Sequence, residues 1–196
     1  MAIILASASP ARQAILKNAG LTVRSQPAGI DERAAEAPLI KSGAGADDLA
    51  QALAMIKARH VSEQHPADLV IGADQVLEIE GERLSKPADM TAARRQLLKL
   101  AGKAHHLHSA VACCRDGAVI WQHMETVRLT MRPLTPAEIG RYLAKVGASA
   151  LTSVGAYQIE GPGIQLFERI EGDYFAILGL PLLPLLTFLR ARGEIE

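Results

Sequence analysis

Short apolar runs alternate along this chain with stretches in which apolar residues recur at the three- and four-residue spacing of a helix. Residues 3–6 predict a strand, and residues 10–19 predict a helix that Ser9 caps and Gly20 ends. Further strands are predicted at residues 21–23, 69–71, 76–79, 109–114, 119–124, 126–131 and 164–170. Further helices are predicted at residues 47–60, 91–100 and 135–145, and from residue 181 onwards. This alternation of strands and helices predicts an α/β fold.

The predicted elements form a single domain over residues 1–196. The Asp116-Gly117 pair between two apolar runs is typical of a tight hairpin turn, so the sheet is expected to be mixed. Residues 26–41 are rich in proline, glycine and acidic residues and are interpreted as a loop that contains Asp31 and Glu32. No repeat and no linker divides the chain. The sequence therefore predicts one domain with a mixed, twisted sheet and helices on both faces.

Composition narrows the class of protein. Apolar residues make up 49% of the chain, and 21 basic residues balance 21 acidic ones, so neither a nucleic-acid polymer nor a membrane surface is an expected partner. The two cysteines, Cys113 and Cys114, are adjacent and form no disulfide framework. Residues 175–189 are apolar, but Gly179, Pro181 and Pro184 interrupt them before they reach the length of a membrane span. A cytoplasmic protein is expected.

The first strand leads through a turn rich in hydroxyl groups directly into the first helix. The free N–H groups and the positive dipole end of a helix favour an anion at such a turn. Ser7, Ser9 and Arg12 would complete a cradle for phosphate oxygens, because a guanidinium group matches their geometry. The alternative is an ordinary capped strand–helix junction with a surface arginine.

Asp74 is predicted to lie where a buried strand ends, which is a frequent place for reacting groups in α/β proteins. Taken alone, it is interpreted as a turn cap. Arg12, Lys57 and Lys86 supply cations near the ends of other segments, and Glu32 supplies a second carboxylate. Such a mixture suits polyphosphate chemistry, in which cations neutralise oxygens, carboxylates hold a metal and a base orients water.

The cluster His105, His106 and His108 is a weaker candidate for a metal site. Its spacing on a strand divides the three rings between two faces, and the cysteines lack the spacing of a closed zinc site. Packing or local hydrogen bonding is the favoured interpretation of these histidines.

Five short motifs occur in one order along nearly the whole chain: residues 5–10 with Arg12, residues 72–74, residues 86–87, residues 155–157 and residues 179–181. Together they resemble the Maf family of nucleoside triphosphate pyrophosphatases. The resemblance implies a mixed α/β fold similar to that of the inosine triphosphate pyrophosphatases, with two lobes around a cleft and a homodimeric assembly. It also implies hydrolysis of a nucleoside triphosphate to the monophosphate and pyrophosphate, with a divalent metal cation, Mg²⁺ or Mn²⁺, as cofactor.

The same resemblance assigns roles to individual residues. The phosphates would be held by Ser7, Ser9 and Arg12, and neutralised by Lys57 and Lys86. Asp74 would be the catalytic carboxylate, assisted by Glu32, and both would be ligands of the metal.

Three positions depart from the usual pattern of the family. Ala11 replaces the first of two arginines, Gln75 stands where threonine is frequent, and Glu160 replaces a glutamine. Gln75 and Glu160, together with residues 167–169, are more similar to the subgroup that acts on 7-methyl-GTP than to the subgroup that acts on dTTP and UTP. A carboxylate can accept from the N–H groups of a guanine and favours a cationic methylated ring, so Glu160 is expected to bind substrate. The resemblance to this subgroup implies that Gln75 binds substrate as well.

Other functions stay open at this stage. The same reaction on dTTP, UTP or other triphosphates is one alternative, and a non-catalytic nucleotide-binding regulator of cell division is another. A binder of small anions that uses only the serine turn is a third.

Overall fold

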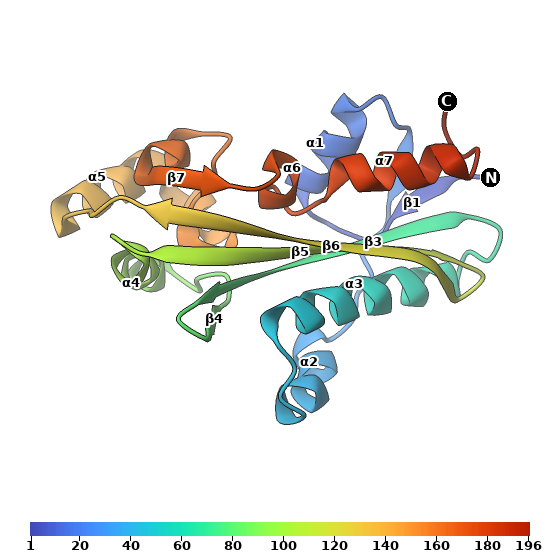
Figure 1. Cartoon of the computed structure of the whole chain (residues 1–196), viewed down its shortest axis with the longest axis horizontal. Coiled ribbons are helices and arrows are strands. Elements are labelled where there is room, and N and C mark those ends of the chain that lie inside the picture. The colour runs from blue at the N-terminus through green and yellow to red at the C-terminus, as the bar shows by residue number, and fades with distance from the viewer. The chain divides into compact units, whose positions relative to one another are not determined.

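The computed structural model describes residues 1–196 and contains seven strands and seven α-helices (Figure 1). The strands are β1 Ile3–Leu5, β2 Val23–Ser25, β3 Leu69–Ile79, β4 Glu82–Leu84, β5 Ala104–Arg115, β6 Ala118–Met131 and β7 Phe167–Glu171. The helices are α1 Pro10–Asn18, α2 Glu32–Lys41, α3 Ala46–Ser62, α4 Met90–Leu100, α5 Pro136–Val146, α6 Tyr174–Ile177 and α7 Leu182–Ala191. Three 3₁₀ segments follow α5, at Gly147–Leu151, Val154–Ala156 and Pro162–Leu166.

The seven strands form one mixed sheet with the order β2-β1-β3-β5-β6-β7, and β4 pairs with β3 off this path. Strand β1 is parallel to both β2 and β3, whereas β4 is antiparallel to β3 and β7 is antiparallel to β6. The prediction of a mixed α/β sheet is therefore confirmed. None of the helices is both long and apolar enough to cross a lipid bilayer.

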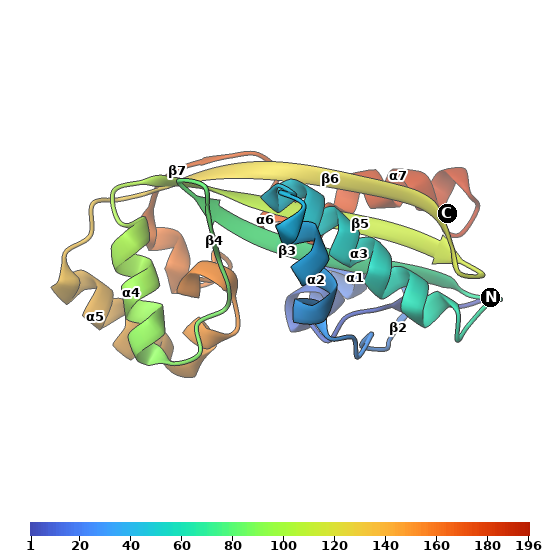
Figure 2. The ribbon, with the colours of Figure 1, turned by 90° about the horizontal axis from the view of Figure 1, so that it is seen from below.

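The chain divides into two compact units, and β3, β5 and β6 each contribute to both. The first unit contains residues 1–75, 108–125 and 173–196, and the second contains residues 76–107 and 126–172. In the first unit, α3 covers one face of the strands while α1 and α7 cover the other (Figures 1 and 2). Helices on both faces are thus confirmed for this unit.

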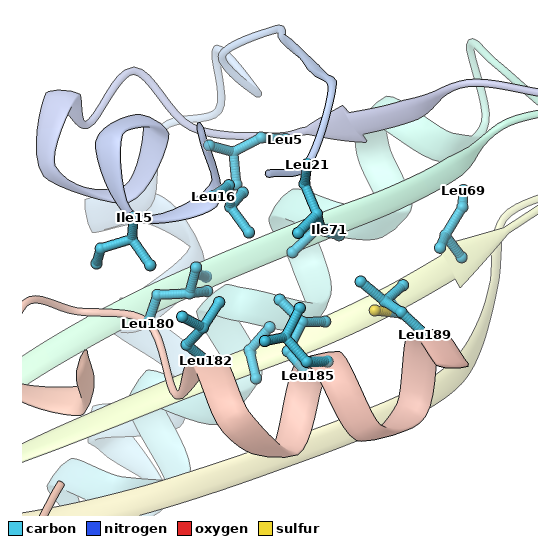
Figure 3. Close-up of a cluster of buried hydrophobic side chains, with 14 residues drawn as sticks. Leu5, Ile15, Leu16, Leu21, Leu69, Ile71, Leu180, Leu182, Leu185 and Leu189 are labelled. Atoms are coloured by element: carbon cyan, nitrogen blue, oxygen red, sulfur yellow. The ribbon is translucent and has the colours of Figure 1, made fainter. Parts of the chain in front are cut away.

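The core of the first unit lies between its strands, α1 and α7. Figure 3 shows leucines of α7 pointing toward Ile71 of β3 and toward Leu16 of α1. Side chains on the other face of the same strands, Ile4 and Val70, pack against Val61 of α3. This two-sided burial explains why residues 69–71 are continuously apolar.

In the second unit, α4 packs against α5 and against the 3₁₀ segments Gly147–Leu151 and Val154–Ala156. Its interior contains His105, whose Nε2 lies 2.8 Å from the hydroxyl oxygen of Tyr157, and both rings are buried. Burial lowers the pKa of His105 to about 4, so this imidazole is neutral at pH 7. The preference for packing over metal binding agrees with this environment.

Two predicted helix starts, those of α1 and α5, are confirmed by their caps. The Ser9 hydroxyl accepts from the Arg12 backbone N–H, with Pro10 at the first helical position. Thr135 and Glu138 form a capping box at the start of α5. The Asp116-Gly117 turn joins β5 to β6 as predicted.

The prediction of a loop over residues 26–41 is wrong from Glu32 onwards, where α2 begins. The Asp31 carboxylate accepts from the Ala34 backbone N–H and caps this helix. Good helix-forming residues follow at 33–37, and they outweigh Pro38 in the interior of α2.

Several predicted strand limits also need correction. Strand β3 continues without a break through Asp74, so this carboxylate lies inside a strand and not at its end. The strands predicted at 119–124 and 126–131 are one strand, β6. The strand predicted at 164–170 begins only at Phe167, because Pro162–Leu166 forms a 3₁₀ turn.

The absence of a side chain at Gly72 permits the close contact between β3 and α3. A Cβ atom at this position would lie 2.2 Å from the Ala54 carbonyl oxygen and 2.7 Å from the Ala58 nitrogen. Both atoms belong to the helix backbone, which cannot move aside as a flexible side chain can. Gly72 therefore fixes how closely α3 approaches the strand that carries Asp74.

Gly72→Ala is expected to lower the free energy of unfolding by about 2 kcal/mol or more, because the added methyl group overpacks this contact. Urea unfolding would measure the loss. Gly140→Ala is the matched control, since its Cβ would meet only Arg94 Nη1 at 3.6 Å within α5. The control is expected to be neutral or stabilising by about 0.5–1 kcal/mol. Equal stability of both variants would contradict the contact.

Candidate active site

The turn between β1 and α1 places the serine hydroxyls as the sequence predicts. The Ser7 hydroxyl accepts from the Ser9 backbone N–H at 3.1 Å, and Ser7 is buried. Ser25, at the end of β2, donates its hydroxyl to the Ser7 carbonyl oxygen at 2.7 Å. Gln13 in turn donates to the Ser25 hydroxyl at 3.1 Å. The turn is thus held by side chains of its own helix and of the neighbouring strand.

Arg12 connects this turn to two distant parts of the chain. Its Nε donates to the Gly179 carbonyl oxygen and its Nη1 to the Ala73 carbonyl oxygen, each at 2.8 Å. Nη1 also lies 3.4 Å from the Ser7 hydroxyl oxygen. The structure therefore places Arg12 beside the strand segment that carries Asp74. Burial lowers the pKa of Arg12, and the charges of Asp74 and Glu32 oppose that effect.

Lys57 lies between two carboxylates. Its Nζ is 2.5 Å from Asp74 Oδ1 and 2.8 Å from Glu32 Oε1. The side chains of Lys57 and Asp74 are each 10% exposed, whereas that of Glu32 is 51% exposed. Three residues that the sequence predicts for the site, from α3, β3 and α2, are thus in direct contact.

The local structure explains how each group reaches this position. Lys57 belongs to the buried face of α3, together with Leu53, Ala54 and Ala58. The sequence indicated Lys57 only as a cation near the end of a segment, whereas α3 buries it and turns it toward β3. Glu32 is the first residue of α2, directly after the Asp31 cap. The capped start of α2 therefore positions the second carboxylate.

The electrostatic balance at Asp74 has two opposing parts. Burial raises the pKa of Asp74, while the positive charges of Lys57 and Arg12 lower it. Burial is the larger effect, so the pKa of Asp74 lies above the usual range of an aspartate. A carboxylate of raised pKa is a stronger base once it is ionised, and such groups concentrate at reacting sites.

The carboxylates beside Lys57 are the candidate ligands of the metal that the resemblance implies. No group of three or more His, Cys, Asp or Glu side chains is arranged to hold a metal ion. Asp74 and Glu32 nevertheless converge on one point, where they now contact the same ammonium group. Magnesium is frequently held by one or two carboxylates together with substrate phosphates and water. The two carboxylates fit a divalent cation that arrives with a polyphosphate.

Two predicted site residues belong to the second unit. Lys86 lies in the exposed segment between β4 and α4, and Glu160 is exposed after the 3₁₀ segment Val154–Ala156. Their predicted roles in neutralising phosphate and binding the base stay predictions.

Gln75 directs its amide away from the Asp74 cluster. Successive residues of a strand point to opposite faces, and Gln75 Nε2 donates to the carbonyl oxygens of Ala176 and Ile177. The Ser109 hydroxyl oxygen accepts from the same nitrogen at 2.9 Å. Neither Ser109 nor these carbonyls were expected from the sequence. The only local signal was a serine in an otherwise apolar strand.

Comparison with known proteins identifies the family. Residues 2–192 match the family described as Maf-like protein. A protein of Mesorhizobium japonicum named 7-methyl-GTP pyrophosphatase is 59% identical, with 99% of this chain and 98% of that protein covered. A protein of the same name from Brucella abortus is 58% identical over the same shares of the two chains. A nucleoside triphosphate pyrophosphatase of Granulibacter bethesdensis is 50% identical and covers 100% of this chain and 99% of that protein.

Among solved structures, a HAM1 protein of Coxiella burnetii covers 68% of this chain and 74% of its own, with 16% identity and a TM-score of 0.45. The assignment therefore depends on the family match and on the relatives of 50–59% identity, which cover nearly the full length. On that evidence the chain belongs to the Maf family.

Proposed function

We propose that this protein hydrolyses a nucleoside triphosphate to the nucleoside monophosphate and pyrophosphate. The observation that carries the proposal is the buried Lys57 ammonium between Asp74 and Glu32, beside a serine turn that holds Arg12. Cations, carboxylates and hydroxyl groups together are the set of groups that phosphoryl transfer requires. The names of the relatives, which cover almost the whole chain, support the same reaction.

The phosphates would be held at the serine turn. The hydroxyl groups of Ser7 and Ser9 lie at the start of α1, where the helix dipole favours negative charge. Arg12 keeps its guanidinium in a fixed direction, because two of its nitrogens donate to backbone carbonyls. Lys57, and Lys86 from the second unit, would neutralise the charge that grows on the phosphate oxygens.

Asp74 would act as the general base. Its raised pKa suits the removal of a proton from the attacking water, and Lys57 holds the carboxylate in place. The water oxygen forms a new bond to phosphorus while the α–β anhydride bond breaks. The electron pair of that bond leaves with pyrophosphate, and the proton passes to Asp74. Glu32 would assist by fixing Lys57.

A divalent cation, Mg²⁺ or Mn²⁺, would be held by Asp74 and Glu32 together with phosphate oxygens of the substrate. Such a cation neutralises the charge of the triphosphate and of the leaving pyrophosphate when it is bound.

The substrate is proposed to be 7-methyl-GTP. Relatives at 54–59% identity carry that name. Glu160 is exposed and acidic, and a carboxylate would accept from the N–H groups of guanine and attract the positive charge of the methylated ring.

Turnover of a panel of triphosphates in magnesium or manganese tests the function. We expect release of pyrophosphate, not of single phosphates, and the highest kcat/KM for 7-methyl-GTP. Glu160→Gln is expected to reduce the preference for 7-methyl-GTP over GTP by about tenfold, since one charge contact is worth about that factor. A preference of the wild type for dTTP or UTP would reject the methylguanine assignment but keep the reaction.

Asp74→Asn is expected to lower turnover by about a hundredfold or more while the fold is kept, because the amide cannot accept the proton of water. Circular dichroism would verify the fold. Asp116→Asn is the matched control, since Asp116 lies in the β5–β6 turn and should leave turnover unchanged. A biological effect that survives Asp74→Asn, in a protein without measurable turnover, would favour the non-catalytic regulator instead.

The pH profile of kcat/KM tests the role of Asp74 as base. Activity should be lost as the pH falls through the raised pKa of Asp74, because the protonated acid cannot take a proton. Lys57 lowers this pKa, so Lys57→Gln is expected to move the acid limb of the profile to higher pH, besides lowering the rate.

Lys99→Gln is the control for this experiment, since Lys99 pairs with Glu82 at an exposed position. An acid limb that stays in place in Lys57→Gln would show that another group titrates.

A further inference from the structure

The segment Ala176–Gly179 comprises the last two residues of α6 and the two residues that follow, and it is held by hydrogen bonds to its carbonyl groups. Gln75 Nε2 donates to the Ala176 oxygen at 3.0 Å and to the Ile177 oxygen at 2.9 Å. The Ser109 hydroxyl donates to the Ala176 oxygen at 2.6 Å and is fully buried. These carbonyls are at the C-terminal end of α6, where the Ala176 oxygen also accepts from the Gly179 backbone N–H at 2.9 Å.

These contacts determine how the Gln75 amide is oriented. Three acceptors surround Nε2, namely two carbonyl oxygens and the Ser109 hydroxyl oxygen. Rotation of the amide by half a turn would place Oε1 against the two carbonyl oxygens, which is repulsive. The donor side of Gln75 is therefore committed to the protein.

The same segment also holds Arg12. The Gly179 carbonyl oxygen accepts from Arg12 Nε, and Arg12 Nη1 donates to the Ala73 carbonyl oxygen. Ala73 and Gln75 are two residues apart on β3, with Asp74 between them pointing to the opposite face. The hydrogen bonds thus form a ring that starts on β3, passes through residues 176–179 and Arg12, and returns to β3.

Gly179 is required at its place in this ring. Its φ of +92° is in a region that residues with a side chain rarely adopt. A Cβ atom there would lie 3.3 Å from both Nε and Nη2 of Arg12. A side chain at this position would therefore displace the guanidinium group.

We propose that Gln75 and Ser109 are positioning residues that set the Arg12 guanidinium for phosphate, acting through the segment Ala176–Gly179. We call Gln75, Ser109 and this segment the Gln75 clamp. The inference rests on the proposed function in that Arg12 is taken to hold the phosphates. It assigns Gln75 an indirect role in binding the phosphates in place of a contact with the base. A change at Gln75 should therefore weaken the binding of every nucleoside triphosphate to the same extent.

Titration calorimetry with inorganic tripolyphosphate measures phosphate binding alone. This ligand has no base, and its affinity is measured without reference to nucleotide hydrolysis. Gln75→Met keeps the length of the side chain and removes its donors, and we expect about tenfold weaker binding, since small displacements of a positioned group have effects of this size or larger. Ser109→Ala and Gly179→Ala are expected to weaken binding in the same direction. For all three variants, the ratio of kcat/KM between 7-methyl-GTP and GTP should stay unchanged.

Two controls separate positioning from a general loss of stability. Ser62→Ala removes another fully buried hydroxyl group. The Ser62 hydroxyl oxygen accepts from the Gly117 backbone N–H at 3.1 Å, a contact that does not involve Arg12. Gly193→Ala introduces a side chain at a φ of +68° with no atom within 4 Å of the new Cβ. Both controls should bind tripolyphosphate as the wild type does, whatever their thermal stability.

The outcomes are distinct. An altered base ratio with unchanged tripolyphosphate affinity in Gln75→Met would overturn the proposal and assign Gln75 to the base. Wild-type affinity in Gly179→Ala and Ser109→Ala, or no binding by the wild type, would also overturn it. Weakened binding in the three variants, in a protein that hydrolyses no triphosphate, would support the clamp while the proposed function fails.

Discussion

The burial of the Lys57 ammonium between Asp74 and Glu32 is the constraint on which the arrangement of the first unit depends. A buried charge is tolerated only where opposite charges meet it closely, so strand, helix and turn must all supply groups at one point. Gly72 makes this possible, because only a glycine allows β3 to approach the backbone of α3 at Ala54 and Ala58. The close packing of α3 against β3 and the pairing of the Lys57 and Asp74 charges therefore depend on each other.

The charges around this point are balanced before any substrate binds. Lys57 and Arg12 oppose Asp74 and Glu32, and Arg12 also directs two nitrogens to carbonyl oxygens. A triphosphate brings several negative charges to such a site, and a balanced site offers little net attraction to it. The balance thus favours a polyanion that is accompanied by cations of its own, as in the proposal that a divalent metal would be held by the carboxylates together with the phosphates.

Local signals allowed the serine turn, the helix caps at Ser9 and Thr135 and the β5–β6 hairpin to be predicted from sequence, because each depends on neighbouring residues. Helix α2 was missed, since the proline and glycine content around it hid the Asp31 cap and the helix formers that follow. Asp74 was identified, but its place inside β3 was not, because the strand continues past a charged residue whose burial depends on Lys57 of α3 and on the charge of Arg12. The carbonyl partners of Gln75 are 101 and 102 residues away and Ser109 is 34 residues away, and no local pattern signals such contacts.

Because residue 11 is an alanine, Arg12 is the only arginine at this turn, and its orientation matters more. The resemblance in sequence implies two arginines after Pro10, and this chain has Ala11 at the first of those positions. A single guanidinium must then be correctly placed without help from a neighbour, and a flexible side chain would lose conformational entropy on each binding event. Contacts to Gly179 and Ala73 remove that freedom in advance. The ring of hydrogen bonds through Gln75 therefore lowers the entropy cost of binding at the one arginine of this turn.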